Sequence, residues 1–142
     1  MAMGHVISAT SRYTLPAKGR GHLIARAEVL LGQARDAYSA GRMGEAVEFA
    51  YQAALRTAGA WVADSSVGKR KRKPRGAWAQ LELVGGEAVQ WAQRFAADSA
   101  RRSRLLSGID HDPDREWVEA LVTDAERFYA NVAMDQMWGA AA

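Results

Sequence analysis

The sequence predicts an all-α fold, an up-and-down bundle of four to five helices. Of the 142 residues, 29 are alanine and only 17 are Val, Ile or Thr, a balance that favours helix over strand. Apolar residues recur three and four positions apart through most of the chain, which is the helical period, and no segment alternates convincingly between apolar and polar residues. A chain of this length can bury one core without a disulfide or a structural metal.

Two helices joined by a short turn are predicted to follow a flexible lead-in over residues 1–21. The bundle itself is expected to span residues 22–138 as a single domain. One apolar stripe runs through about 23–38, and Gly41 stands where the end of a helix favours glycine. A second helix, about 43–63, is rich in alanine on one side, so the two helices should pack closely as an antiparallel hairpin.

The helical pattern breaks over residues 64–76 and then resumes in three segments. A short helix ends at the Gly85-Gly86 pair, and a further helix covers about 87–106. The last helix has the clearest start signal in the chain, because Asp112 can cap it and Pro113 suits its first position.

Composition excludes several kinds of chemistry. The chain has no cysteine, so disulfides, thiol nucleophiles and Fe–S ligation are excluded. It has three histidines, and it lacks the glycine-rich phosphate loops and the serine nucleophile motif, so we expect no metal and no cofactor. No apolar stretch approaches the ~18 residues that a membrane span needs, and no apolar signal region is found at the N-terminus. We therefore expect a cytoplasmic protein without a membrane partner.

The net charge of +3 conceals a strong asymmetry, since residues 1–109 carry 17 basic and 8 acidic side chains and residues 110–142 carry 2 and 8. Six cations occupy one run of seven residues: Lys69, Arg70, Lys71, Arg72, Lys73 and Arg75. Cations this close together can contact several phosphates at once, so RNA is the partner that we expect first. The run has no interleaved aromatic residues, which argues against base stacking. The alternative is a solvated loop whose charges balance the acidic last helix.

Arg104 and His111 are the candidate catalytic residues. An arginine that binds phosphate beside a histidine acting as general acid and base is sufficient for metal-independent RNA cleavage. Alternatively, Arg104 is a cation favoured in the last turn of a helix and His111 is a turn residue. Four carboxylates within residues 110–116 would repel a phosphodiester and favour protonated histidine. We therefore expect binding rather than catalysis.

The chain resembles the HEPN domains over about residues 23–133. The opening hairpin carries Ala34-Arg-Asp-Ala-Tyr-Ser-Ala-Gly41 and Tyr51-Gln-Ala-Ala-Leu55, and the later helices carry Trp78-Ala-Gln-Leu81, Trp91-Ala-Gln-Arg-Phe95 and Asp124-Ala-Glu-Arg-Phe128. The later segments are similar to those of a small actinobacterial branch of these domains. The hairpin is also similar to a tetratricopeptide unit, but no second unit follows at that repeat's spacing of about 34 residues.

The resemblance to HEPN domains implies a bundle of four or five helices that forms a homodimer. Many such domains are ribonucleases in which an arginine, a spacer of four to six residues and a histidine from two copies meet at the dimer interface. Arg104 and His111 match the upper limit of that spacing, but the residue after the arginine is usually polar and is Leu105 in this chain. We therefore expect a non-catalytic member that binds RNA or an RNA-associated protein. A metal-independent ribonuclease that uses Arg104 and His111 and a protein–protein adaptor without nucleic acid are the alternatives.

Overall fold

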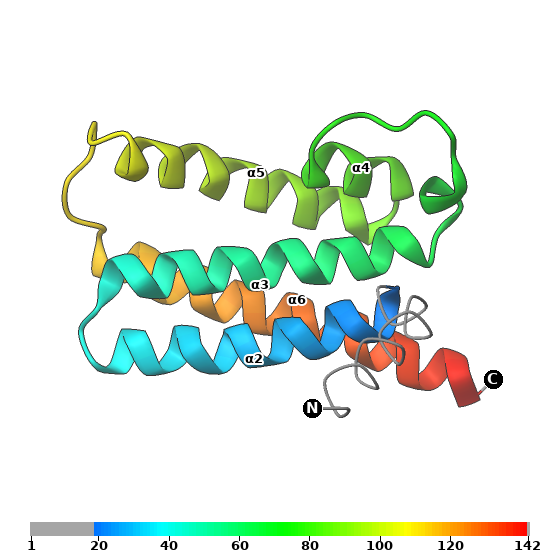
Figure 1. The fold of residues 1–142 in the computed structure, drawn as a ribbon, viewed down its shortest axis with the longest axis horizontal. Coiled ribbons are helices and arrows are strands. Elements are labelled where there is room, and N and C mark those ends of the chain that lie inside the picture. Colours follow the sequence, from blue (N-terminus) through cyan, green and yellow to red (C-terminus); the bar gives the residue numbers. More distant parts are fainter. Residues whose placement is uncertain (1–18, 142) are drawn as a thin grey trace, which may run out of the picture.

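The computed structural model describes residues 19–141, and the side chains of residues 19–135. Its elements in chain order are α2 (Arg20–Ser39), α3 (Met43–Ala63), the 3-10 helix η2 (Ser66–Lys69), α4 (Ala77–Val84), α5 (Glu87–Leu106) and α6 (Arg115–Ala141). The four long helices run up and down, and the short α4 lies between α3 and α5 in the chain (Figure 1). The predicted all-α bundle is therefore confirmed, and the described residues include no strand.

The first helix of the bundle begins slightly earlier than the predicted domain boundary. Helix α2 starts at Arg20, which the sequence placed in the lead-in, and residues 1–18 lie outside the described part of the chain. The Arg20 guanidinium donates to the carbonyl oxygen of Val132 at 2.6 Å and contacts Asp64 at 3.4 Å. These contacts tie the start of α2 to α6 and to the end of α3.

Small residues bring α2 and α3 close together as the predicted antiparallel hairpin. Ala27, Ala34 and Ala37 of α2 are fully buried, as are Ala46 and Ala50 of α3. Alanine side chains let two helix backbones approach closely while still removing apolar surface from water.

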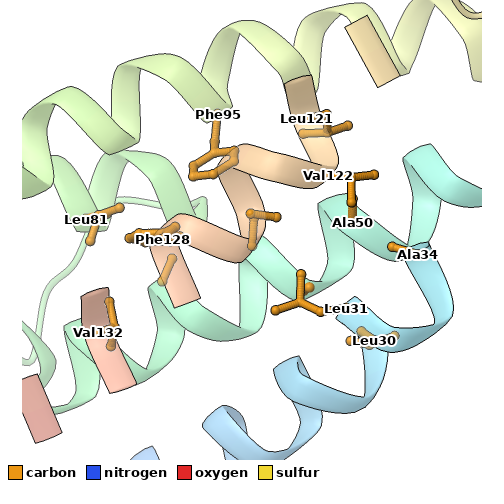
Figure 2. Close-up of a cluster of buried hydrophobic side chains, with 14 of the residues drawn as sticks. Leu30, Leu31, Ala34, Ala50, Leu81, Phe95, Leu121, Val122, Phe128 and Val132 are labelled. Atoms are coloured by element: carbon orange, nitrogen blue, oxygen red, sulfur yellow. The ribbon is translucent and has the colours of Figure 1, made fainter. Parts of the chain in front are cut away.

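Aromatic side chains fill the space between α5 and the rest of the bundle. Phe95 of α5 and Phe128 of α6 are both fully buried, with ring centroids 5.2 Å apart. Trp91 lies 5.1 Å from Phe128, and Trp78 of α4 lies 5.1 Å from Phe95. In the close-up, Phe95 and Leu81 lie beside Phe128 (Figure 2). Bulky rings therefore fix the position of α4 and α5, whereas alanines fix that of α2.

The predicted start of the last helix is wrong by about two residues. Helix α6 begins at Arg115, and its first turn is closed by the N–H of Val118 donating to the carbonyl of Asp114 at 3.0 Å. Asp112 and Pro113 therefore belong to the preceding loop. An acidic residue stands at both 112 and 114, so the sequence offered two starts of similar chemistry.

No helix in the described residues is both long enough and apolar enough to span a membrane.

Candidate functional site

The cationic run begins at Lys69, the last residue of η2, and continues through the connection to α4; we call residues 69–75 the cationic loop. Every residue from 69 to 76 is exposed. In Figure 1 this green segment arches over α4. Among the side chains that the structure describes, none of the six cations takes part in an ion pair. Six positive charges therefore face solvent in one place.

The residues before the cationic loop are held against the end of α3. Ser65 caps η2 because its Oγ accepts from the N–H of Val67 at 3.2 Å, and the same hydroxyl donates to the carbonyl of Val62 at 2.7 Å. The Val67 side chain is buried. Gly68 lies close to the backbone at the end of α3: a Cβ atom on residue 68 would be 2.5 Å from the carbonyl oxygen of Val62. Glycine at position 68 thus lets this segment pack against the end of α3, and a larger residue would push the two apart.

Two side-chain hydrogen bonds hold the loop itself. Lys73 Nζ donates to the carbonyl of Gly68 at 3.2 Å, and Gln80 Nε2 from α4 donates to the carbonyl of Pro74 at 2.9 Å. The cationic loop is therefore an arch held by one hydrogen bond to Gly68, at its start, and by another from Gln80, on the side that leads into α4. The sequence predicted an irregular segment here but gave no sign of these anchors.

Three carboxylates of α6 form ion pairs with other helices, and none pairs with the cationic loop among the described side chains. Arg35 of α2 contacts Glu119 at 3.2 Å and Glu126 at 2.7 Å, and Arg94 of α5 contacts Asp124 at 3.0 Å. The predicted balance between the loop and the acidic last helix is therefore not found among the described residues.

The positions of the two charged regions explain why they do not pair. The loop follows the carboxyl end of α3, whereas the start of α6 lies at the opposite end of the bundle (Figure 1). Helix α3 has 21 residues and is therefore about 30 Å long at ~1.5 Å per residue. That distance is several times the Debye length of about 8 Å at physiological ionic strength.

The structure places Arg104 and His111 at the α5–α6 end of the bundle without joining them. Arg104 Nε donates to Asp110 at 3.0 Å. His111 is exposed and lines two open hollows, one of about 390 Å³ that includes Arg101 and one of about 210 Å³ that includes Arg102. Arg104 lines neither hollow. In a single chain, the arginines that share a hollow with His111 are thus Arg101 and Arg102, and not Arg104.

A polar network near His111 was not found by reasoning from the sequence. Arg102 donates to both carboxylate oxygens of Glu48, at 2.8 and 2.9 Å, and lies over the Tyr51 ring at 4.6 Å. The Tyr51 hydroxyl donates to Ser99 and accepts from the Trp78 indole N–H, each at 2.9 Å. Hydrogen bonding from Arg102 lowers the pKa of Glu48. The network links three helices, and its members are too far apart in sequence for any spacing rule to have revealed it.

Asp98 is a carboxylate whose pKa is shifted upward. Its partial burial raises the pKa, although the Trp117 indole N–H donates to it at 2.9 Å. Arg101 covers the Trp117 ring at 4.5 Å. These contacts fasten α5 to α6, and within the described residues no group of three or more His, Cys, Asp or Glu side chains could hold a metal ion.

Comparison with known proteins identifies a family. The family model for SAV_6107-like HEPN domains matches residues 37–133, which is about two thirds of the chain. This range runs from the end of α2 to the middle of α6 and includes both the cationic loop and the Arg104–His111 segment. No curated protein and no solved structure matches the chain.

Proposed function

The chain belongs to the SAV_6107-like HEPN family. We propose that it is a non-catalytic member that binds RNA through the cationic loop. One observation carries the proposal: six cations in seven residues are exposed, unpaired among the described side chains and held on an anchored arch. Lysine and arginine side chains that neutralise phosphates release condensed counterions, which supplies affinity without sequence reading. Binding is measured with purified protein and purified RNA, so that any affinity observed reflects direct contact and not contact through an RNA-associated protein.

The test compares two triple variants that lose the same charge. One replaces Arg70, Arg72 and Arg75 of the loop with glutamine. The control replaces Arg26, Arg56 and Arg127, which lie outside the loop, with glutamine. We expect the loop variant to lose most of its affinity for a labelled RNA and the control to keep most of it. Equal loss in the two variants would mean that overall charge governs binding and not the loop.

Salt dependence supplies the second measurement. If all six cations contact a single strand, the logarithm of the wild-type binding constant should fall with the logarithm of salt concentration at a slope of about −4. The loop variant should show a slope about half as steep, because half of the contacts are lost. A slope near zero, or one that the loop variant leaves unchanged, would refute electrostatic binding by the loop.

The ribonuclease alternative has less support from the geometry of one chain. Arg104 is engaged by Asp110, and carboxylates surround His111. Wild type and His111→Ala are incubated with labelled RNA in EDTA. We expect no cleavage by either protein. Cleavage by the wild type that His111→Ala abolishes would establish the ribonuclease and overturn the non-catalytic assignment.

We propose further that the chain forms a homodimer, as the family resemblance implies. Exposed apolar side chains at the α5–α6 end, Leu106 at 68% and Ile109 at 61% exposure, are compatible with a contact between copies. Sedimentation of the wild type should give the dimer mass. A monomer at all concentrations would contradict this expectation.

A further inference from the structure

We infer that the cationic loop selects double-helical nucleic acid over single strands, because a double helix offers the loop a rigid surface with a higher density of phosphates. This inference rests on the proposed function and specifies the ligand of the same site. Its support comes from the shape, composition and anchoring of the loop.

The loop is an exposed arch with no groups suited to reading bases. Proteins that bind single strands commonly use a positively charged groove with aromatic side chains on which bases stack. Residues 69–75 contain only lysine, arginine and proline, and all of them are exposed. The nearest aromatic residue in the sequence, Trp78, is half-buried, and its indole N–H is donated to Tyr51. A protruding arch suits the outside of a double helix, where shape and backbone are recognised without base contacts.

The higher charge density of a double helix strengthens its attraction to the loop. Seven residues reach at most about 24 Å when fully extended. A double helix presents one phosphate charge per ~1.7 Å of its axis, twice the density of either strand alone. Arg70 has extended backbone angles, and Lys73 is biased toward them by Pro74. The chain bends at residues 71, 72, 75 and 76, so the cations are not arranged in one straight row.

The anchors make the arch more suited to a rigid ligand than to a flexible one. Two exposed hydrogen bonds, from Lys73 to Gly68 and from Gln80 to Pro74, favour one shape of the loop before any ligand arrives. A preorganised site loses less conformational entropy on binding, and the gain is greatest when the ligand's charges are also at fixed spacing. A flexible single strand can adapt its shape to the loop, so its affinity should depend little on whether the loop is ordered in advance. Gln80 is therefore a positioning residue whose effect should fall on duplex binding.

The experiment measures binding of the full chain to a short blunt-ended RNA duplex, to the DNA duplex of the same sequence and to one unpaired strand of each. We expect the duplexes to bind about tenfold more tightly than their strands at 0.1 M salt, from five contacts at slopes of about −4.5 and −3.5, because Lys73 is held by the Gly68 carbonyl. Gln80→Ala should reduce this preference severalfold while single-strand affinity stays near the wild-type value. Gln90→Ala, at an exposed glutamine of α5, is the control and should leave the preference unchanged.

The outcomes separate this inference from the proposed function. Tighter binding to either duplex that Gln80→Ala weakens supports the inference, and the comparison of RNA with DNA identifies which helix is preferred. Equal or tighter binding to single strands, lost in the triple loop variant, overturns the inference and leaves the proposed function standing. A duplex preference that Gln80→Ala does not alter overturns the role of the anchored arch. Absence of binding to every nucleic acid overturns both proposals.

Discussion

Gly68→Ala tests whether the close packing of η2 on α3 fixes the base of the cationic loop. The added Cβ atom would lie 2.5 Å from the carbonyl oxygen of Val62 and 3.0 Å from the Cα atom of Ala63. Both neighbours are backbone atoms at the end of α3, so neither can turn aside as a side chain could. The segment carrying Gly68 has to move away from α3 instead.

The size of the effect follows from these contacts. Restoring a separation of 3.0 Å from the Val62 oxygen requires a shift of at least 0.5 Å. That shift disturbs the buried Val67 side chain and the cap that Ser65 provides to η2. Overpacking of this kind costs about 1–3 kcal/mol. For a domain of this size, the midpoint of thermal unfolding should fall by about 3–10 °C.

Gly32→Ala is the matched control, because it adds the same methyl group with the opposite expected sign. Gly32 lies within α2, and no atom stands within 4 Å of the position its Cβ would take. Alanine in the interior of a helix is favoured over glycine by about 0.5–1 kcal/mol. Denaturant unfolding followed by tryptophan fluorescence should therefore show Gly68→Ala less stable, and Gly32→Ala more stable, than the wild type.

The binding assay completes the test of Gly68. If the base of the arch positions the cations, Gly68→Ala should weaken duplex binding severalfold although it removes no charge. Gly32→Ala should bind as the wild type does. A Gly68→Ala protein that is as stable as the wild type would refute the packing argument, and unchanged binding by a destabilised one would refute the link between packing and loop.

Two further predictions concern the core and the polar network. Phe128→Ala removes a buried ring that contacts other aromatic rings, and it should lower the unfolding free energy by about 3–5 kcal/mol. Phe49→Ala, at a partly buried position, is the control and should lower it by less than about 2 kcal/mol. Equal losses in the two variants would contradict the aromatic packing of α5. Glu48 has a lowered pKa because Arg102 donates to it, so its stabilising effect should be complete above its unfolded pKa of about 4.3 and disappear as pH falls through the lower folded value. The difference in stability between wild type and Glu48→Gln should therefore be largest near neutral pH and shrink on acidification, and a difference that grows in acid would count against the Glu48–Arg102 pair.

The sequence predicted the helices well because their signals are local. Apolar spacing located the helices, and glycines marked the ends of α2, α4 and α5, where Gly41, Gly85 and Gly108 have positive φ angles. The start of α6 was missed because Asp112 and Asp114 offer similar chemistry two residues apart. Choosing between them depends on how α6 packs in the bundle, which no local pattern contains.

The candidate site was only partly predictable for the same reason. The cationic loop is a continuous run and is evident in the sequence, but its anchors join Gln80 to Pro74 and Gly68 to the end of α3 through the fold. The Arg104–His111 spacing suggested a pair, yet Arg104 turns to Asp110, a carboxylate six residues away across the turn that ends α5. Spacing along the chain cannot determine which of several nearby carboxylates an arginine will choose.

Separation of charge along the bundle, and not the net charge, governs what a nucleic acid would meet at each end. The loop and the start of α6 are about 30 Å apart, which matches the Debye length only near ~0.01 M salt. At physiological ionic strength a phosphate beside the loop is therefore attracted by six cations and is scarcely affected by the carboxylates at the start of α6. A phosphate beside His111 meets Asp110 and Asp112 within the hollow, and Arg101 is the one arginine that lines it. The same chain can thus bind RNA at one end and disfavour it at the end where cleavage would require it, which is why binding by the loop gives no support to catalysis by Arg104 and His111.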